Sequence, residues 1–118
     1  MYLLDTSYLI DLVRGVPGAV RLAKRIDDER AYVAISTITF HEYLLGVYLS
    51  HWGTEKLKEM LRRAEVELAR FDILPYTSEV ARKTAEILAT LIKQGRPIGL
   101  ADAIIAATAL THRLKLIT

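Results

Sequence analysis

The stretch YLLDTSYL, residues 2–9, indicates the fold class, because an apolar run stops at a polar triplet before apolar spacing resumes. Residues 2–4 fit a short buried strand. Residues 5–7 suit a turn or a helix N-cap, and residues 8–13 continue with apolar side chains at helical spacing. This segment therefore predicts a strand followed directly by a helix.

The rest of the chain repeats this alternation of short apolar runs and long helical stretches. Such a pattern favours parallel strands, right-handed crossovers and helices on both faces of the sheet. We predict an α/β fold, a three-layer α/β/α sandwich around a central parallel sheet of four strands. Ligands of such sheets bind beyond the carboxyl ends of the strands. The further strands are expected at 32–35, 71–74 and 114–117, and the further helices at 19–28, 38–49, 54–70, 79–93 and 100–112.

Composition bounds the possible functions of the chain. Its 118 residues predict one domain, and 52% hydrophobic residues supply a core. The absence of cysteine excludes disulfides, thiolate zinc sites and cysteine nucleophiles. No basic leader precedes the first strand and no run of about 20 apolar residues is present, so we expect a cytoplasmic protein without a membrane span. A net charge of +2 permits an anionic partner without requiring one.

Three carboxylates stand apart from the mixed charges elsewhere in the chain. Burying ionised carboxylates costs free energy, and a bound cation removes that cost. A cluster of oxygen ligands favours Mg²⁺ or Mn²⁺, which promote phosphodiester hydrolysis by activating water and neutralising developing charge. With histidines counted as neutral, Asp5 is the only charge in residues 1–10, Glu42 in residues 31–54 and Asp102 in residues 97–112.

Each carboxylate also has a purely structural explanation. Asp5 suits an N-cap of the first helix. Glu42 fits a buried pair with an arginine from elsewhere in the fold. Asp102 fits the first turn of its helix, where the helix dipole favours an acid. The hydroxyls of Thr6 and Ser7, beside Asp5, either orient water or a metal ligand or cap the helix. Three such residues at one edge of a sheet are harder to explain by structure alone than any one of them.

Other catalytic motifs find no support in the sequence. His41 and Glu42 begin like a zinc-protease helix, but Leu45 occupies the place of the required second histidine. No serine-hydrolase elbow, phosphate-binding Walker loop or dinucleotide-binding glycine motif is present. Several basic residues either rim the expected crevice and hold phosphates or lie on solvated helix faces. They are Arg14, Arg21, Lys24, Arg25 and Arg96.

Three segments are specific when taken together: LDTSYLID at 4–11, ISTITFHEYLLG at 35–46 and IGLADAIIAA at 98–107. In residue type, order and spacing they resemble PIN domains, specifically the VapC-type toxins of prokaryotic toxin–antitoxin systems. The resemblance implies a Mg²⁺- or Mn²⁺-dependent endoribonuclease. Asp5 and Asp102 would be the principal metal ligands, Glu42 would complete the pocket, and Ser7 or Thr6 would assist.

The same resemblance also implies which partners the protein binds and which residues form the domain. It implies a homodimer, a VapB-like antitoxin that occupies the site, and an RNA substrate such as tRNA or rRNA. Residues 1–118 are expected to form a single PIN-like domain. Family members commonly continue into another acidic loop and a fifth strand, so we expect this domain to lack its C-terminal end.

Two alternatives stay open at this point. The first is a catalytically inert PIN-like module that binds an antitoxin or RNA, and the second is a phosphatase with Asp5 as nucleophile. The phosphatase is the weaker, because Ser7 stands where that chemistry usually has a second aspartate.

Overall fold

A computed structural model describes all residues, 1–118, and contains one parallel sheet. The strand order is β3-β2-β1-β4, and every neighbouring pair is parallel. The predicted α/β class and the four-stranded parallel sheet are confirmed. The strands are β1 (Tyr2–Leu4), β2 (Val33–Ser36), β3 (Asp72–Leu74) and β4 (Lys115–Ile117).

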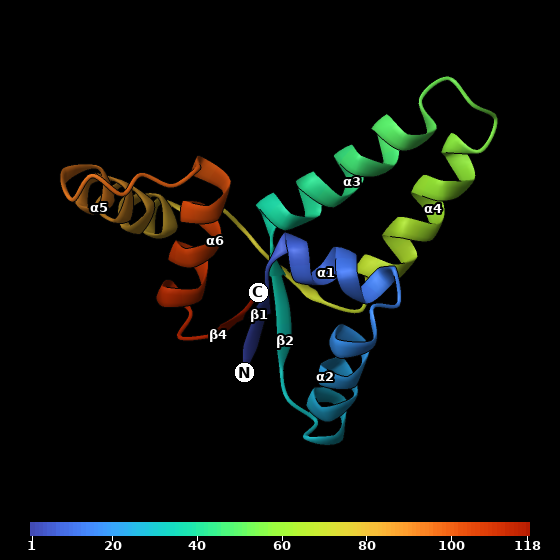
Figure 1. Ribbon diagram of the computed structural model, residues 1–118, viewed down its shortest axis with the longest axis horizontal. Helices are drawn as coiled ribbons and strands as arrows, with labels where there is room; N and C mark the ends of the chain where they lie inside the picture. Colours follow the sequence, from blue (N-terminus) through green and yellow to red (C-terminus); the bar gives the residue numbers. More distant parts are fainter.

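Six helices connect these strands and form the outer layers (Figure 1). The helices α1 and α2 lie on one side of the sheet and α5 and α6 on the other, while α3 and α4 extend from it as a hairpin. The predicted three-layer arrangement is therefore confirmed. The helices are α1 (Thr6–Val13), α2 (Pro17–Asp28), α3 (Thr37–His51), α4 (Leu57–Leu68), α5 (Ser78–Lys93) and α6 (Leu100–Thr111).

The two faces of the sheet have separate hydrophobic cores. Successive strand residues point to opposite faces. Leu3 packs with Ala34 and with residues of α6, whereas Leu4 and Ile35 pack with residues of α1, α2 and α4. Because Leu3 pairs with Ala34 and Leu4 with Ile35 across the sheet, each face receives apolar side chains from both central strands. This requirement explains why the two central strands contain continuous apolar runs.

Two helix starts differ from the sequence prediction by two or more residues. The helix α2 begins at Pro17 rather than at residue 19, because proline at the first helical position has no N–H group to leave unpaired. The helix α4 begins at Leu57 rather than at residue 54. Thr54 does not cap it, since its hydroxyl donates to the backbone carbonyl of His51 and closes the turn after α3 (2.8 Å).

Topology brings several polar segments to one edge of the sheet. In Figure 1, α1 and α3 begin at the carboxyl ends of β1 and β2. The helix α6 runs back toward the start of β4, so its first turn also lies toward this edge. We call this edge of the sheet the carboxyl edge.

None of the helices combines the length and apolar character needed to cross a membrane.

Candidate active site at the carboxyl edge

Asp5 joins the end of β1 to the start of α1. Its backbone N–H donates to the carbonyl of Ile117 in β4 (2.9 Å), which extends the sheet pairing by one residue. Its Oδ1 accepts a hydrogen bond from the backbone N–H of Tyr8 (2.7 Å), so Asp5 is the N-cap of α1. The predicted capping role is confirmed. The cap uses one carboxylate oxygen of this half-buried side chain and leaves Oδ2 without a protein hydrogen bond.

Glu42 lies in the second turn of α3, half-buried against α1. Its Oε1 accepts a hydrogen bond from the hydroxyl of Thr6 (2.7 Å). It forms no salt bridge, so the structural alternative of a buried pair with arginine is wrong. Thr6 directly follows Asp5 in the chain, and its bond to Glu42 therefore holds two of the three carboxylates in neighbouring positions.

Asp102 lies in the first turn of α6, as the structural alternative proposed. Its side chain is exposed. The N-cap, Gly99, has no side chain for capping, and a Cβ atom placed on Gly99 would lie only 4.0 Å from Asp102 Oδ2. The carboxylate is therefore close to the start of the helix, where the helix dipole stabilises negative charge.

The three carboxylates share the carboxyl edge, and none of them forms a salt bridge. The two ion pairs of the structure are both on exposed helix surfaces, Arg62 with Glu59 and Lys83 with Glu86. No three of the histidine, aspartate and glutamate side chains are grouped closely enough to hold a metal ion. Convergence of the three carboxylates on one ion therefore stays a prediction, and it requires side-chain movement relative to this structure. The donor set fits a hard cation, because all of its atoms are carboxylate oxygens without a cationic partner.

The hydroxyl residues beside the carboxylates differ in their surroundings. Ser7 is exposed and makes no side-chain hydrogen bond within the protein, whereas Thr6 is half-buried and bonded to Glu42. The structure adds two buried residues that the sequence prediction did not include in the site, Thr39, which is hydrogen-bonded to Thr6, and Ser36, which is hydrogen-bonded to Thr39. The available signal was spacing, because residues three apart are neighbours at a helix surface and the N-cap Ser36, Thr39 and Glu42 follow one another at that interval.

The sequence model of the PIN domain matches residues 2–118, nearly the whole length of the chain. The chain belongs to the PIN domain family. Among its relatives, the tRNA(fMet)-specific endonuclease VapC of Shigella flexneri is 31% identical, with the match covering 99% of this chain and 84% of that protein. Toxin FitB of Neisseria gonorrhoeae is 36% identical, with 100% and 86% covered.

Solved structures of related proteins share the arrangement of this PIN domain. FitAcB from Neisseria gonorrhoeae superposes with a TM-score of 0.82 at 34% identity, covering 100% of this chain and 86% of that chain. VapBC-1 from nontypeable Haemophilus influenzae superposes with a TM-score of 0.83 at 30% identity, covering 99% and 84%. The family resemblance that the three sequence segments predicted is confirmed.

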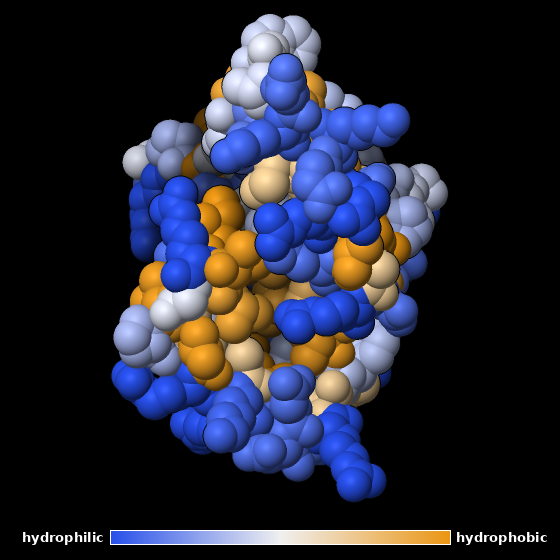
Figure 2. Space-filling view, turned by 90° about the vertical axis from the view of Figure 1, so that its right-hand side faces the viewer, coloured by the Kyte–Doolittle hydropathy of each residue, from blue (hydrophilic) through white to orange (hydrophobic).

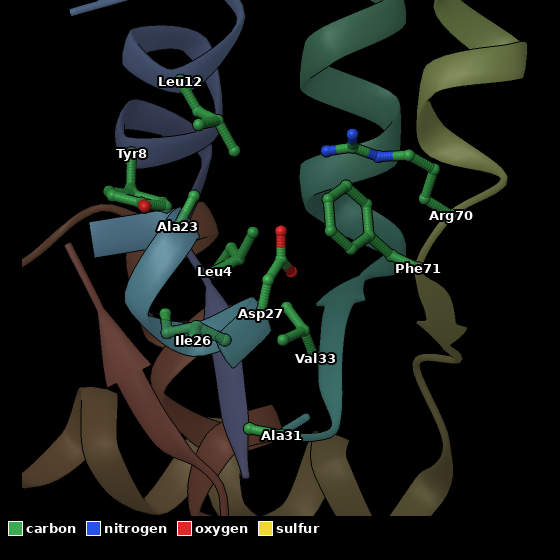
Figure 3. Close-up of a pocket in the computed structure, with 10 residues that line it drawn as sticks. All are labelled: Leu4, Tyr8, Leu12, Ala23, Ile26, Asp27, Ala31, Val33, Arg70 and Phe71. Atoms are coloured by element: carbon green, nitrogen blue, oxygen red, sulfur yellow. The ribbon is translucent and has the colours of Figure 1, made fainter. Parts of the chain in front are cut away.

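The PIN domain also has an apolar groove that contains none of the three carboxylates. Figure 2 shows apolar side chains gathered in a hollow that hydrophilic side chains frame. This groove has a volume of about 360 Å³ and lies between α1, α2, β2 and the end of α4. Figure 3 shows Asp27 and Arg70 turned toward it, and neither forms a salt bridge. The ten lining residues are Leu4, Tyr8, Leu12, Ala23, Ile26, Asp27, Ala31, Val33, Arg70 and Phe71.

Two of the basic residues considered in the sequence lie in different places. Arg14, at the end of α1, lines a hollow together with Glu42. Arg25 lines another hollow with Tyr2 and Lys115, the first residues of β1 and β4. Of these two arginines, only Arg14 lies near Glu42, so only Arg14 could contact a phosphate bound beside Glu42.

Proposed function

We propose that this PIN domain is a VapC-like toxin, a Mg²⁺- or Mn²⁺-dependent endoribonuclease that hydrolyses RNA phosphodiester bonds. The observation that supports this most strongly is the set of three carboxylates, Asp5, Glu42 and Asp102, at one edge of the sheet without cationic partners. Curated relatives that this chain matches over nearly its whole length are named ribonucleases or endonucleases.

Each residue of this site has a distinct proposed role. Asp5 and Asp102 would hold the ion, and Glu42 would complete the pocket with its orientation set by Thr6. A bound Mg²⁺ or Mn²⁺ supplies an activated water and neutralises negative charge on the phosphodiester. Ser7, exposed beside Asp5, would hydrogen-bond the water or a phosphate oxygen. Arg14 lines a hollow together with Glu42, and its positive charge would attract the RNA backbone.

The proposed substrate is structured RNA, and tRNA is the first candidate. A relative at 31% identity bears the name tRNA(fMet)-specific endonuclease, which supports this choice. Ribosomal RNA is the second candidate.

The proposed protein partners are a VapB-like antitoxin and a second copy of this chain. Structural neighbours were solved as toxin–antitoxin complexes, which supports the first. We propose that the antitoxin occupies the carboxylate site and that an apolar segment of it also lies in the apolar groove, because that groove is lined mainly by hydrophobic side chains. The homodimer rests on the family resemblance, and exposed Leu49 and Trp52 at the end of α3 offer apolar surface for association.

Cleavage assays on purified protein test the activity. We expect tRNA or rRNA to be cut in the presence of Mg²⁺ or Mn²⁺ and left intact when EDTA removes the ion. Asp102→Asn should abolish cutting, whereas Glu59→Gln, which removes a carboxylate of an exposed ion pair, should not. Equal cutting by the parent and Asp102→Asn would contradict the proposed site.

A catalytically inert binding module is the alternative function. It predicts tight binding of an antitoxin or RNA without any binding of Mn²⁺. A calorimetric Mn²⁺ titration of the free protein separates the two, because the ribonuclease requires the ion and the inert module does not.

A further inference from the structure

A chain of three hydroxyl groups runs from the N-terminus of α3 to Glu42. Thr6 Oγ1 lies 2.7 Å from Glu42 Oε1 and 3.1 Å from Thr39 Oγ1. Thr39 Oγ1 in turn lies 3.2 Å from Ser36 Oγ. Ser36 and Thr39 are only 1% and 0% exposed, so protein atoms rather than solvent must satisfy their hydroxyls.

The number of protons determines the direction of every bond in this chain. An ionised carboxylate only accepts hydrogen bonds, so the single hydroxyl proton of Thr6 goes to Glu42. The proton between Thr6 and Thr39 must then come from Thr39, and the proton between Thr39 and Ser36 must come from Ser36. Ser36 Oγ accepts the backbone N–H of Thr39 (3.1 Å), which is consistent with Ser36 donating its own proton onward.

All three hydroxyl dipoles therefore point toward the carboxylate. Aligned hydrogen bonds polarise and strengthen one another in a buried environment. The bonds to Thr39 and to Glu42 together hold Thr6 Oγ1 in place, and without the bond from Thr39 the Thr6 side chain would be free to rotate about its Cα–Cβ bond. The oxygen Glu42 Oε1 would then lose its fixed donor.

We propose that Thr39 is a positioning residue for Glu42, acting through Thr6 to hold Oε1 and to direct Oε2 to the ligand of the site. This inference deepens the proposed function and rests on it for the identity of that ligand, a divalent cation. Thr39 does not itself touch the ligand, because it is fully buried. Outer residues that orient metal ligands typically change metal affinity by about 10- to 100-fold when they are replaced.

Thr39→Val is the informative variant, because valine has nearly the shape of threonine and carries a methyl group in place of the hydroxyl. The backbone N–H that Ser36 caps is unchanged, so α3 keeps its N-cap. Thr39→Ser restores the hydroxyl. Thr84→Val is the matched control: Thr84 is a similarly buried threonine, but its hydroxyl donates to the carbonyl of Val80 within α5.

The first readout is Mn²⁺ affinity, measured by calorimetry on the full chain. We expect Thr39→Val and Thr6→Val each to weaken Mn²⁺ binding about 10-fold, with no further loss in the double variant, since both interrupt one chain. Thr39→Ser and Thr84→Val should bind Mn²⁺ as the parent does. An unchanged affinity in Thr39→Val, or an equal loss in Thr39→Ser, would overturn the proposal.

The second readout is the crystal structure of Thr39→Val, with Thr39→Ala as a substitute if the valine variant does not fold. We expect the Thr6 hydroxyl to have turned away from Glu42 in the variant and to stay bonded in Thr39→Ser. A variant in which Thr6 Oγ1 and Glu42 Oε1 keep their 2.7 Å contact would overturn the positioning role. If the parent binds Mn²⁺ and cuts no RNA, the ribonuclease proposal fails, while these structures still decide the role of Thr39.

Discussion

Asp5 has two separable roles, and two substitutions distinguish them. One carboxylate oxygen caps α1 through the N–H of Tyr8, and the negative charge is proposed to bind the metal ion. Asp5→Asn keeps a side-chain oxygen that can accept the capping bond, because asparagine is as good an N-cap as aspartate. It removes the charge. Asp5→Ala removes both the cap and the charge.

The expected loss of stability follows from the cap alone. Replacing an aspartate N-cap by alanine costs about 1 kcal/mol of the free energy of unfolding, within a range of roughly 0.5–2. In a domain of this size that corresponds to a decrease in Tm of roughly 4 °C. Asp5→Asn should stay within about 0.5 kcal/mol of the parent. Both variants should lose Mn²⁺ binding and RNA cleavage.

Thr77→Ala provides the matched control. Thr77 is the N-cap of α5, accepting the backbone N–H of Val80, and lies outside the carboxylate site. Its replacement should lower stability by about 1 kcal/mol and leave cleavage unchanged. Urea unfolding, Mn²⁺ calorimetry and RNA cleavage together measure these quantities. If Asp5→Asn cuts RNA as the parent does, or loses as much stability as Asp5→Ala, the assignment of two roles is refuted.

Three further predictions concern other parts of the molecule. Asp102→Asn should abolish Mn²⁺ binding while changing the free energy of unfolding by less than about 1 kcal/mol, because the side chain is exposed; a larger loss would indicate a structural role. Ala23→Arg places a long cation in the apolar groove and should weaken antitoxin binding in a pull-down of the two purified proteins, whereas Ala89→Arg, exposed on α5, should not; equal binding by both would exclude the groove. Burial and the hydrogen bond to Glu67 raise the pKa of Tyr43 to about 12. As the pH rises, the Tyr43 phenol therefore loses its proton in the unfolded chain before it does in the folded protein, so the free energy of unfolding falls above about pH 10. Tyr43→Phe should reduce that fall, which unfolding curves at alkaline pH measure.

Much of the fold follows from local pattern. The apolar runs at 2–4 and 32–35 are continuous because both faces of the sheet are covered, and long amphipathic stretches after them exclude hairpins. The N-cap at Asp5 could also be predicted from the sequence, because an aspartate that follows an apolar run can accept a hydrogen bond from a free N–H group of the next helix. These features depend on neighbouring residues only.

The remaining features depend on contacts between distant segments. The bond from Thr6 to Glu42 joins residues 36 positions apart and forms only when α1 packs against α3. No local pattern distinguishes a glutamate that meets a hydroxyl from one that meets an arginine. The start of α4 differs for a local reason instead, since the hydroxyl of Thr54 bonds to the carbonyl of His51, three residues earlier, and closes the turn after α3 rather than capping α4.

The crystal structure of the protein with Mn²⁺, with the ion located by its anomalous scattering, tests the central claim most directly. We predict one anomalous peak at the carboxyl edge, with oxygens of Asp5 and Asp102 within about 2.5 Å and Glu42 in the same pocket. Its absence at millimolar Mn²⁺, or a peak bound by other residues, would contradict a metal-dependent site at these carboxylates.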